Sequence, residues 1–274
     1  MSLFDAYIAV DWSASSKPKR GTDSVWLCKR GSPPENPSTR DDATQRVREL
    51  LLQEVVATGK RVLVGFDFPY GYPRGFADLV APGDGAPWRR TWNALARRIR
   101  DQPSNANNRF DVAAHLNVDG GPFWGCPAGH AREALTVKRG ISFPHKGLQE
   151  FRAIERTVRG VQSAWKLYGA GSVGSQALLG IPRVASLRDD PALAPISAVW
   201  PFEPTRQAQV VHVEMWPGLV APSAHTIRDA GQVEALVAQW ARLDEAGSLG
   251  PMFEVPRSAC TEEGWIFGVR AFSS

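Results

Sequence analysis

The feature that most constrains this chain is a short apolar run, residues 7–10, that ends on a lone carboxylate, Asp11. Two later runs end in the same way: VLVGFDFPYG places Asp67 after an apolar stretch, and VVHVEMWPG places Glu214 after another. A carboxylate at the tip of a buried strand needs a charge partner, hydrogen bonds or a metal ion. The three acids therefore predict a sheet whose strand ends converge on one site.

The order of elements supports this arrangement for the first two acids. Residues 7–12 and 24–29 are expected to form an antiparallel hairpin, and a helix capped by Thr39 follows. Residues 61–67 are almost continuously apolar, as in a parallel strand that is buried on both faces. A right-handed strand–helix–strand crossover would place Asp11 beside Asp67.

The rest of the chain extends the same α/β pattern. Residues 197–202 and 209–214 are expected to be strands, and a last helix is expected to start near Thr226. Between them, residues 74–195 form a large insertion that is predicted to be mostly helical or irregular, including a long helix over 148–168. The chain contains no internal repeat and no low-complexity linker, so residues 1–274 are predicted to form a single domain.

Composition narrows the class of protein. Hydrophobic residues make up 43% of the chain, and the net charge of +4 tolerates a polyanionic ligand without requiring one. Three widely spaced cysteines fit neither a zinc site nor a disulfide framework, which suits a reducing cytoplasm. No apolar run is long enough to cross a bilayer and no signal peptide is present, so we expect a cytoplasmic protein without a membrane partner.

The converging carboxylates are candidate ligands for Mg²⁺ or Mn²⁺, which prefer hard oxygen donors. We expect Asp11, Asp67 and Glu214 to bind the metal, with Asp229 as a fourth catalytic acid. The alternative is that each acid caps a turn or pairs with an arginine. Asp229 also fits a capping box with Thr226. Glu262 and Glu263 are weaker candidates for the last ligand.

Two other segments are candidates for substrate binding. Ser13 follows the first acid, and the loop GAGSVG contributes Ser172, with Gln176 two residues beyond it. This loop matches GxGxxG literally, but it follows no strand, which argues against a dinucleotide fold. An arginine-rich segment over 88–109 includes Arg97 and Arg98, which would hold phosphates. The alternative is a solvated helix face whose tryptophans lie in the core.

The motifs AVDWS, GFDFPYG, VEMWPG, GSVGSQ and EEGWIFG resemble the RNase H-like superfamily, and within it a group of predicted nucleases. The resemblance implies a mixed five-stranded sheet of order 3-2-1-4-5 flanked by helices. It also implies bound Mg²⁺ or Mn²⁺ and phosphodiester hydrolysis, with Asp11 and Asp67 as the first two metal acids and Glu214 as the third. Some similar bacterial proteins are labelled as molybdopterin-guanine dinucleotide synthesis proteins.

These observations lead to one main functional hypothesis and three alternatives. The main hypothesis is a metal-dependent phosphodiesterase that acts on a nucleic acid or nucleotide substrate. The first alternative is an actin-like nucleotide-binding phosphotransferase, with the serines after Asp11 holding phosphate. The others are a molybdopterin-nucleotide-related protein and a non-catalytic ligand-binding protein. The sequence indicates neither the natural substrate nor the oligomeric state.

Overall fold

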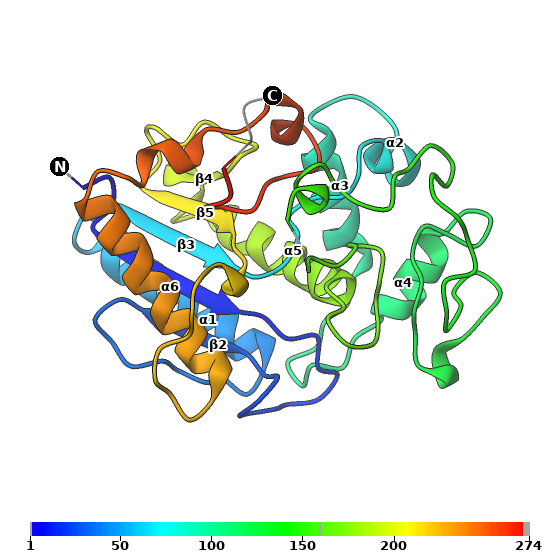
Figure 1. The fold of residues 1–274 in the computed structure, drawn as a ribbon, viewed down its shortest axis with the longest axis horizontal. Coiled ribbons are helices and arrows are strands. Elements are labelled where there is room, and N and C mark those ends of the chain that lie inside the picture. Colours follow the sequence, from blue (N-terminus) through cyan, green and yellow to red (C-terminus); the bar gives the residue numbers. More distant parts are fainter. Residues whose placement is uncertain (1, 159, 271–274) are drawn as a thin grey trace.

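A computed structural model describes residues 2–158 and 160–270. Within them the chain forms an α/β fold around one mixed sheet of five strands in the order β2-β1-β3-β5-β4 (Figure 1). The strands are β1 (Ala6–Asp11), β2 (Trp26–Lys29), β3 (Val62–Phe66), β4 (Ser197–Val199) and β5 (Val210–Glu214). β2 is antiparallel to β1, and the other neighbouring pairs are parallel. The predicted α/β class with a mixed five-stranded sheet is confirmed.

The strand order differs from the expected 3-2-1-4-5 at both edges. Beyond β2, the chain forms only an isolated bridge between Leu27 and Glu35, so the third strand of the expected meander is reduced to one contact. At the other edge, the short strand β4 precedes β5 in sequence and lies outside it. The proline-rich residues near Glu35 account for the first difference, because proline cannot donate to a ladder.

The six α-helices of the described residues divide between the sheet and the insertion. They are α1 (Arg40–Leu51), α2 (Phe76–Val80), α3 (Pro87–Arg98), α4 (Arg109–Leu116), α5 (Gly174–Arg188) and α6 (Arg228–Glu245). Shorter helical turns are Leu52–Val56, Ala128–His130, Ile154–Arg156, Ala194–Ile196, Pro217–Leu219, Gly250–Phe253 and Arg257–Cys260. Among the described residues, no helix is both long and apolar enough to cross a membrane.

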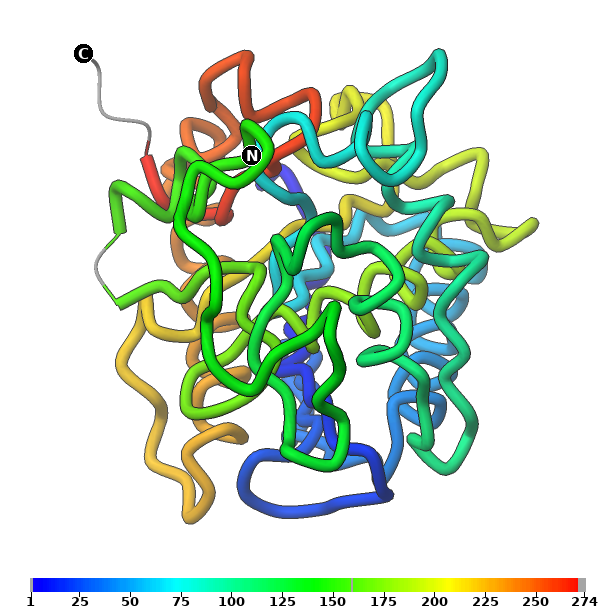
Figure 2. The backbone as a smooth tube through the Cα atoms, turned by 90° about the vertical axis from the view of Figure 1, so that its right-hand side faces the viewer, coloured from blue at the N-terminus to red at the C-terminus, as the bar shows by residue number. Residues whose placement is uncertain are grey.

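The two faces of the sheet pack against different partners. One face, with Ile8, Val64 and Val210, shares a core with α1, α3 and α5. The opposite face, with Ala9 and Val213, packs against α6 and the C-terminal segment 249–267. α6 crosses in front of the sheet in Figure 1, and the insertion extends to its right. Figure 2 views the molecule from that side, where residues 117–158 and 160–173 wind across the insertion.

The capping of α1 agrees with the sequence. The Thr39 hydroxyl accepts a hydrogen bond from the Asp42 amide at 3.1 Å, and Asp41 and Asp42 occupy the first turn. The last predicted helix is also present as α6, but its first turn is not held by a capping box. Its N-cap is Ile227, and Asp229 accepts instead from the amide of Asp23 at 2.8 Å.

The prediction of a long helix over 148–168 is wrong. Its apolar residues repeat at helical spacing, yet they belong to two different cores. Leu148 and Trp165 are buried in the core on the α5 side of the sheet, whereas Ile154 is buried in the core on the α6 side. A straight helix cannot place one stripe in two cores. The segment's described residues, 148–158 and 160–168, are therefore irregular apart from the single turn Ile154–Arg156.

The helix that follows, α5, contains Gly180 and Pro182, two residues that disfavour a helix locally. Proline in a helix interior costs about 3 kcal/mol. Here the surrounding residues Leu178, Ile181 and Val184 are fully buried, and that burial outweighs the cost. Gly180 is required by close packing, since a Cβ there would lie 2.3 Å from the ring of Phe68.

Candidate functional site

A cleft of about 680 Å³ opens at the carboxyl ends of β1 and β3. Its walls come from the loop after β1, the segment 160–173, the first turn of α5, the turn after β5 and the first turn of α6. Its charged lining residues within the described chain are Asp11, Asp23, Asp67, Arg228 and Asp229. The carboxyl edge of a parallel sheet is where α/β proteins commonly bind ligands.

The register of the sheet brings Asp11 and Asp67 together. Val10 pairs with Phe66, so the residues that follow them are neighbours on the same face. Their carboxyl groups are within hydrogen-bonding reach of each other, and Asp67 Oδ1 also accepts from the Trp12 amide at 2.5 Å. The predicted convergence of these two acids is thus present in the structure.

The environment of this pair favours its protonated form. Burial raises the pKa of Asp11 to about 7. The hydrogen bond with Asp67 acts in the opposite direction, and the charges of Asp229 and Asp23 raise the pKa further. Burial and the neighbouring charge of Asp11 also raise the pKa of Asp67 well above its ordinary value. Neither carboxylate forms an ion pair with any lysine or arginine of the described residues. The pair therefore lacks a compensating cation.

Asp229 lies on the facing wall, at the start of α6, and is partly buried. It affects Asp11 and Asp67 through its charge and holds the loop between β1 and β2 through the Asp23 amide. Asp23 was not predicted from the sequence. It has a left-handed backbone with φ of 53°, and its position across from Asp229 comes from tertiary packing that local sequence does not signal.

The structure does not bring Glu214 to this cleft. Val10 pairs with Phe66 and Phe66 pairs with Glu214, so Glu214 shares the face of Phe66, opposite to that of Asp67. There Glu214 is buried and paired with the fully buried Arg152, with Nη2 to Oε1 at 2.6 Å and Nη1 to Oε2 at 2.8 Å. The arginine pairing that was the alternative for this acid is what the structure shows.

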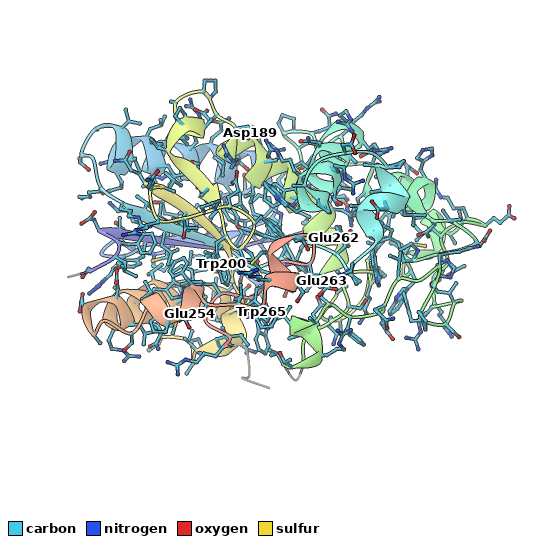
Figure 3. The ribbon with its side chains drawn as sticks, turned by 90° about the horizontal axis from the view of Figure 1, so that it is seen from above. Asp189, Trp200, Glu254, Glu262, Glu263 and Trp265 are labelled. Carbon is cyan, nitrogen blue, oxygen red and sulfur yellow. The ribbon has the colours of Figure 1, made fainter. Side chains whose placement is uncertain are left out.

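Glu262 and Glu263 are likewise used inside the fold. Glu262 accepts from the amides of Gly75 and Ala77 at 2.9 and 2.6 Å, and so caps the start of α2. Glu263 accepts from the amides of Arg74 and Ala153 at 3.1 and 2.8 Å. Figure 3 shows both on the C-terminal segment between the sheet and the insertion. Neither lines the cleft.

The candidate substrate residues divide into two groups. Ser13, Ser172 and Gln176 line the cleft, and Gln176 Nε2 donates to the Trp12 carbonyl at 2.6 Å. Arg97 and Arg98 lie in the last turn of α3 and are not part of the cleft lining. The tryptophans of that helix are buried in the core, as the alternative interpretation of the segment expected.

One buried arginine outside the predicted set positions the cleft loop. Arg40 is fully buried at the start of α1, and its guanidinium donates to the carbonyls of Ser13 and Ser15 at 3.1 and 2.7 Å. Its other donors hold the Asp101 carboxylate and the Asn105 carbonyl. Arg40 therefore fixes the backbone directly after Asp11. No sequence pattern distinguished Arg40, which follows Thr39, as a residue that positions the cleft.

The donor chemistry of the cleft fits Mg²⁺ or Mn²⁺ through two ligands. Asp11 and Asp67 are adjacent carboxylates without a cation partner among the described residues, and Mg²⁺ is commonly held by one or two carboxylates plus water and substrate phosphates. No group of three or more His, Cys, Asp or Glu in residues 2–158 and 160–270 is arranged to hold a metal ion. The expected three-acid site that includes Glu214 is therefore replaced by a two-carboxylate candidate.

The resemblance to RNase H-like proteins rests on short motifs, and it remains a prediction. Comparison of the chain with protein-family models, curated proteins and solved structures gave no match.

Proposed function

We propose that this protein is a divalent-metal-dependent phosphodiesterase whose metal is held by Asp11 and Asp67. The observation that carries the proposal is the pair of adjacent strand-end carboxylates, open to a cleft and without a cation partner among the described residues. Two buried acids in this state are unfavourable unless they share a proton or bind a cation. A divalent ion supplies Lewis-acid activation of a phosphodiester and of water.

The chain's own residues then have distinct roles. Asp11 and Asp67 hold the ion, and Asp229 adds negative charge from the facing wall. Arg40 keeps the loop after Asp11 in place through the carbonyls of Ser13 and Ser15. Gln176 braces the Trp12 carbonyl and leaves its own side-chain oxygen available at the rim. Glu214 has no place in the metal shell in this proposal.

Metal binding tests the proposal directly. We expect millimolar Mn²⁺ or Mg²⁺ to raise the melting temperature, because a ligand that binds only the folded state at 100 times its Kd adds about 2.7 kcal/mol. Asp11→Asn should abolish the shift, and it should also abolish Mn²⁺-dependent hydrolysis of bis(p-nitrophenyl) phosphate. The measurements are thermal unfolding with and without metal, and release of p-nitrophenol.

Asp84→Asn is the matched control, since Asp84 is exposed and lies outside the cleft. This variant should respond to Mn²⁺ as the wild type does. A metal-induced shift that Asp11→Asn retains in full would contradict the proposal. A shift without any hydrolysis would instead favour the non-catalytic ligand binder, and heat on adding ATP with Mg²⁺ would favour the actin-like phosphotransferase.

A further inference from the structure

The charge of the cleft limits what it can hold. Four aspartates line it, and Arg228 is the one arginine or lysine among the described lining residues. Proteins that hold a nucleic acid strand use a positively charged groove along the backbone. A divalent ion at Asp11 and Asp67 would neutralise one phosphate position, and it would leave the neighbouring phosphates of a strand facing carboxylates.

The arginine-rich segment offers no substitute for that groove. Arg89 bonds to both carboxylate oxygens of Asp189 at 2.6 Å, and Arg90 bonds to Asp78 at 2.6 Å. Arg98 donates to main-chain carbonyls, and Arg109 is buried against Ser16, Asn107 and Ser175. These four side chains are used within the fold, Arg97 and Arg100 are exposed, and none of the six arginines lines the cleft.

The wall of the cleft formed by the turn after β5 is instead suited to contact a planar ring. Trp216 lines the cleft and is partly exposed, in the turn directly after β5. Its indole packs against the main chain at Gly218, where an added Cβ would lie 2.7 Å from the ring. The absence of a side chain at Gly218 therefore leaves room for the ring in this position. Aromatic side chains presented in this way stack nucleobases without regard to sequence.

Three amide side chains lie around the same opening. Gln162, Gln176 and Gln232 all line the cleft, and each amide carries both donors and an acceptor. The Gln162 oxygen accepts from Lys166 Nζ at 3.3 Å, and the Gln176 nitrogen donates to the Trp12 carbonyl. Within residues 2–158 and 160–270, this leaves the Gln162 nitrogen and the Gln176 oxygen available to a heterocycle edge. A volume of about 680 Å³ is in the usual range for a small-molecule site.

From these observations we infer that the cleft binds a small phosphodiester that carries an aromatic heterocycle, of about dinucleotide size, with the ring stacked on Trp216. Its phosphate end rests on the proposed metal-dependent function. Its ring end rests independently on Trp216, Gly218 and the amides. A nucleic acid strand is excluded as the preferred ligand by the charge of the lining.

The experiment measures binding by calorimetry, in Mn²⁺, of three cleavage-resistant probes. They are a phosphorothioate-linked diadenosine, a 20-residue phosphorothioate oligoadenylate, and diethyl phosphate, which has no ring. We expect the diadenosine to bind at least about tenfold more tightly than diethyl phosphate, because stacking on one aromatic ring contributes that much. The 20-nucleotide probe should bind no more tightly than the diadenosine once its affinity is divided by its 19 linkages.

Variants locate the effect. Trp216→Leu should remove most of the preference for the diadenosine and leave Mn²⁺ binding unchanged, and Trp216→Phe should keep most of it. Gly218→Ala should weaken diadenosine binding by displacing the ring. Trp124→Leu is the control, because Trp124 is also partly buried but lies outside the cleft.

Two outcomes would overturn the inference. One is a 20-nucleotide probe that binds more than tenfold tighter per linkage than the diadenosine, with a steep salt dependence, as a strand-binding surface would give. The other is unchanged diadenosine binding in Trp216→Leu. A wild-type protein that does not bind Mn²⁺ would instead disprove the proposed function. Diadenosine binding to the wild type and to Trp216→Leu, measured without metal, would still test whether the ring stacks on Trp216.

Discussion

Two strand ends in this sheet carry carboxylates in opposite electrostatic states. At β1 and β3, Asp11 and Asp67 lie together without a cation among the described residues, and the pKa of each is raised. At β5, Glu214 is bound by both terminal nitrogens of Arg152 and by the Tyr70 amide at 2.9 Å. The sequence motifs at these strand ends look alike, yet one carboxylate pair has no cation beside it among the described residues and the other carboxylate is paired with an arginine.

The difference follows from register. Moving one residue along a strand reverses the face of its side chain. Phe66 pairs with Glu214, whereas Asp67 comes one position later, so the third acid is directed toward the insertion rather than toward α6. A buried ion pair holds structure together, and an unpaired acidic pair stores unfavourable energy that a ligand can relieve.

The largest expected effect is at the paired end. Arg152→Met should lower the free energy of unfolding by about 3–5 kcal/mol, because it leaves Glu214 and Glu155 buried without their shared cation. Urea unfolding followed by far-UV circular dichroism measures this. Arg30→Met is the control: Arg30 pairs with Glu245 at an exposed site, and its loss should cost less than about 1 kcal/mol. Equal losses in the two variants would remove the contrast between the strand ends.

The second effect is a pH dependence at the unpaired end, measured without metal. The pKa of Asp11 is about 7 in the folded protein and 3.8 as its ordinary value. Between these values the folded state holds a proton that the unfolded chain releases, so this contribution is complete below about 3.8 and is lost as pH rises through 7.

Asp11→Asn should remove that loss, and at pH 8 it should be more stable than the wild type by on the order of 2–4 kcal/mol. Urea unfolding at pH 4.5, 6 and 8 in EDTA measures the difference. At pH 4.5 the two proteins should differ much less. A wild type whose stability is flat from pH 4.5 to 8 relative to Asp11→Asn would show that the acid pair is not strained.

The smallest effect concerns the facing wall. Asp229 raises the pKa of Asp11 only through its charge, as a weaker cause than burial. Asp229→Asn should therefore shift the pH profile slightly toward lower pH and stabilise the metal-free protein at pH 8 by less than about 1 kcal/mol. The same pH series measures it. A shift as large as that of Asp11→Asn would place Asp229 within the pair rather than opposite to it.

Residues that act through local pattern were predicted from the sequence. The apolar runs of β1, β3 and β5, the Thr39 cap and the crossover that joins Asp11 to Asp67 all follow from periodicity and chain connection. The placement of Ser13, Ser172 and Gln176 at the cleft follows from the same reasoning.

Residues that depend on pairing between distant segments could not be predicted in this way. Alternation places Val210, His212 and Glu214 on one face of β5, but it does not show which residue of β3 lies opposite Glu214. The partner Arg152 lies in a segment whose spacing predicted a helix, and burial in two separate cores overrides that pattern. Pro182 disfavours α5 because proline removes a hydrogen bond from a helix interior, but tertiary packing outweighs this cost.

Residues 262–267 cover the carboxyl end of β5, and this has a consequence for the order of folding events during synthesis. The Glu263 carbonyl accepts from Arg152, Ile266 bridges to Glu214, and a Cβ on Gly71 would meet the Glu262 carbonyl at 2.0 Å. A nascent chain that has just completed β5 has Glu214 and Arg152 but lacks the segment that covers them. The cover over this ion pair can therefore form only after residues 262–267 have left the ribosome.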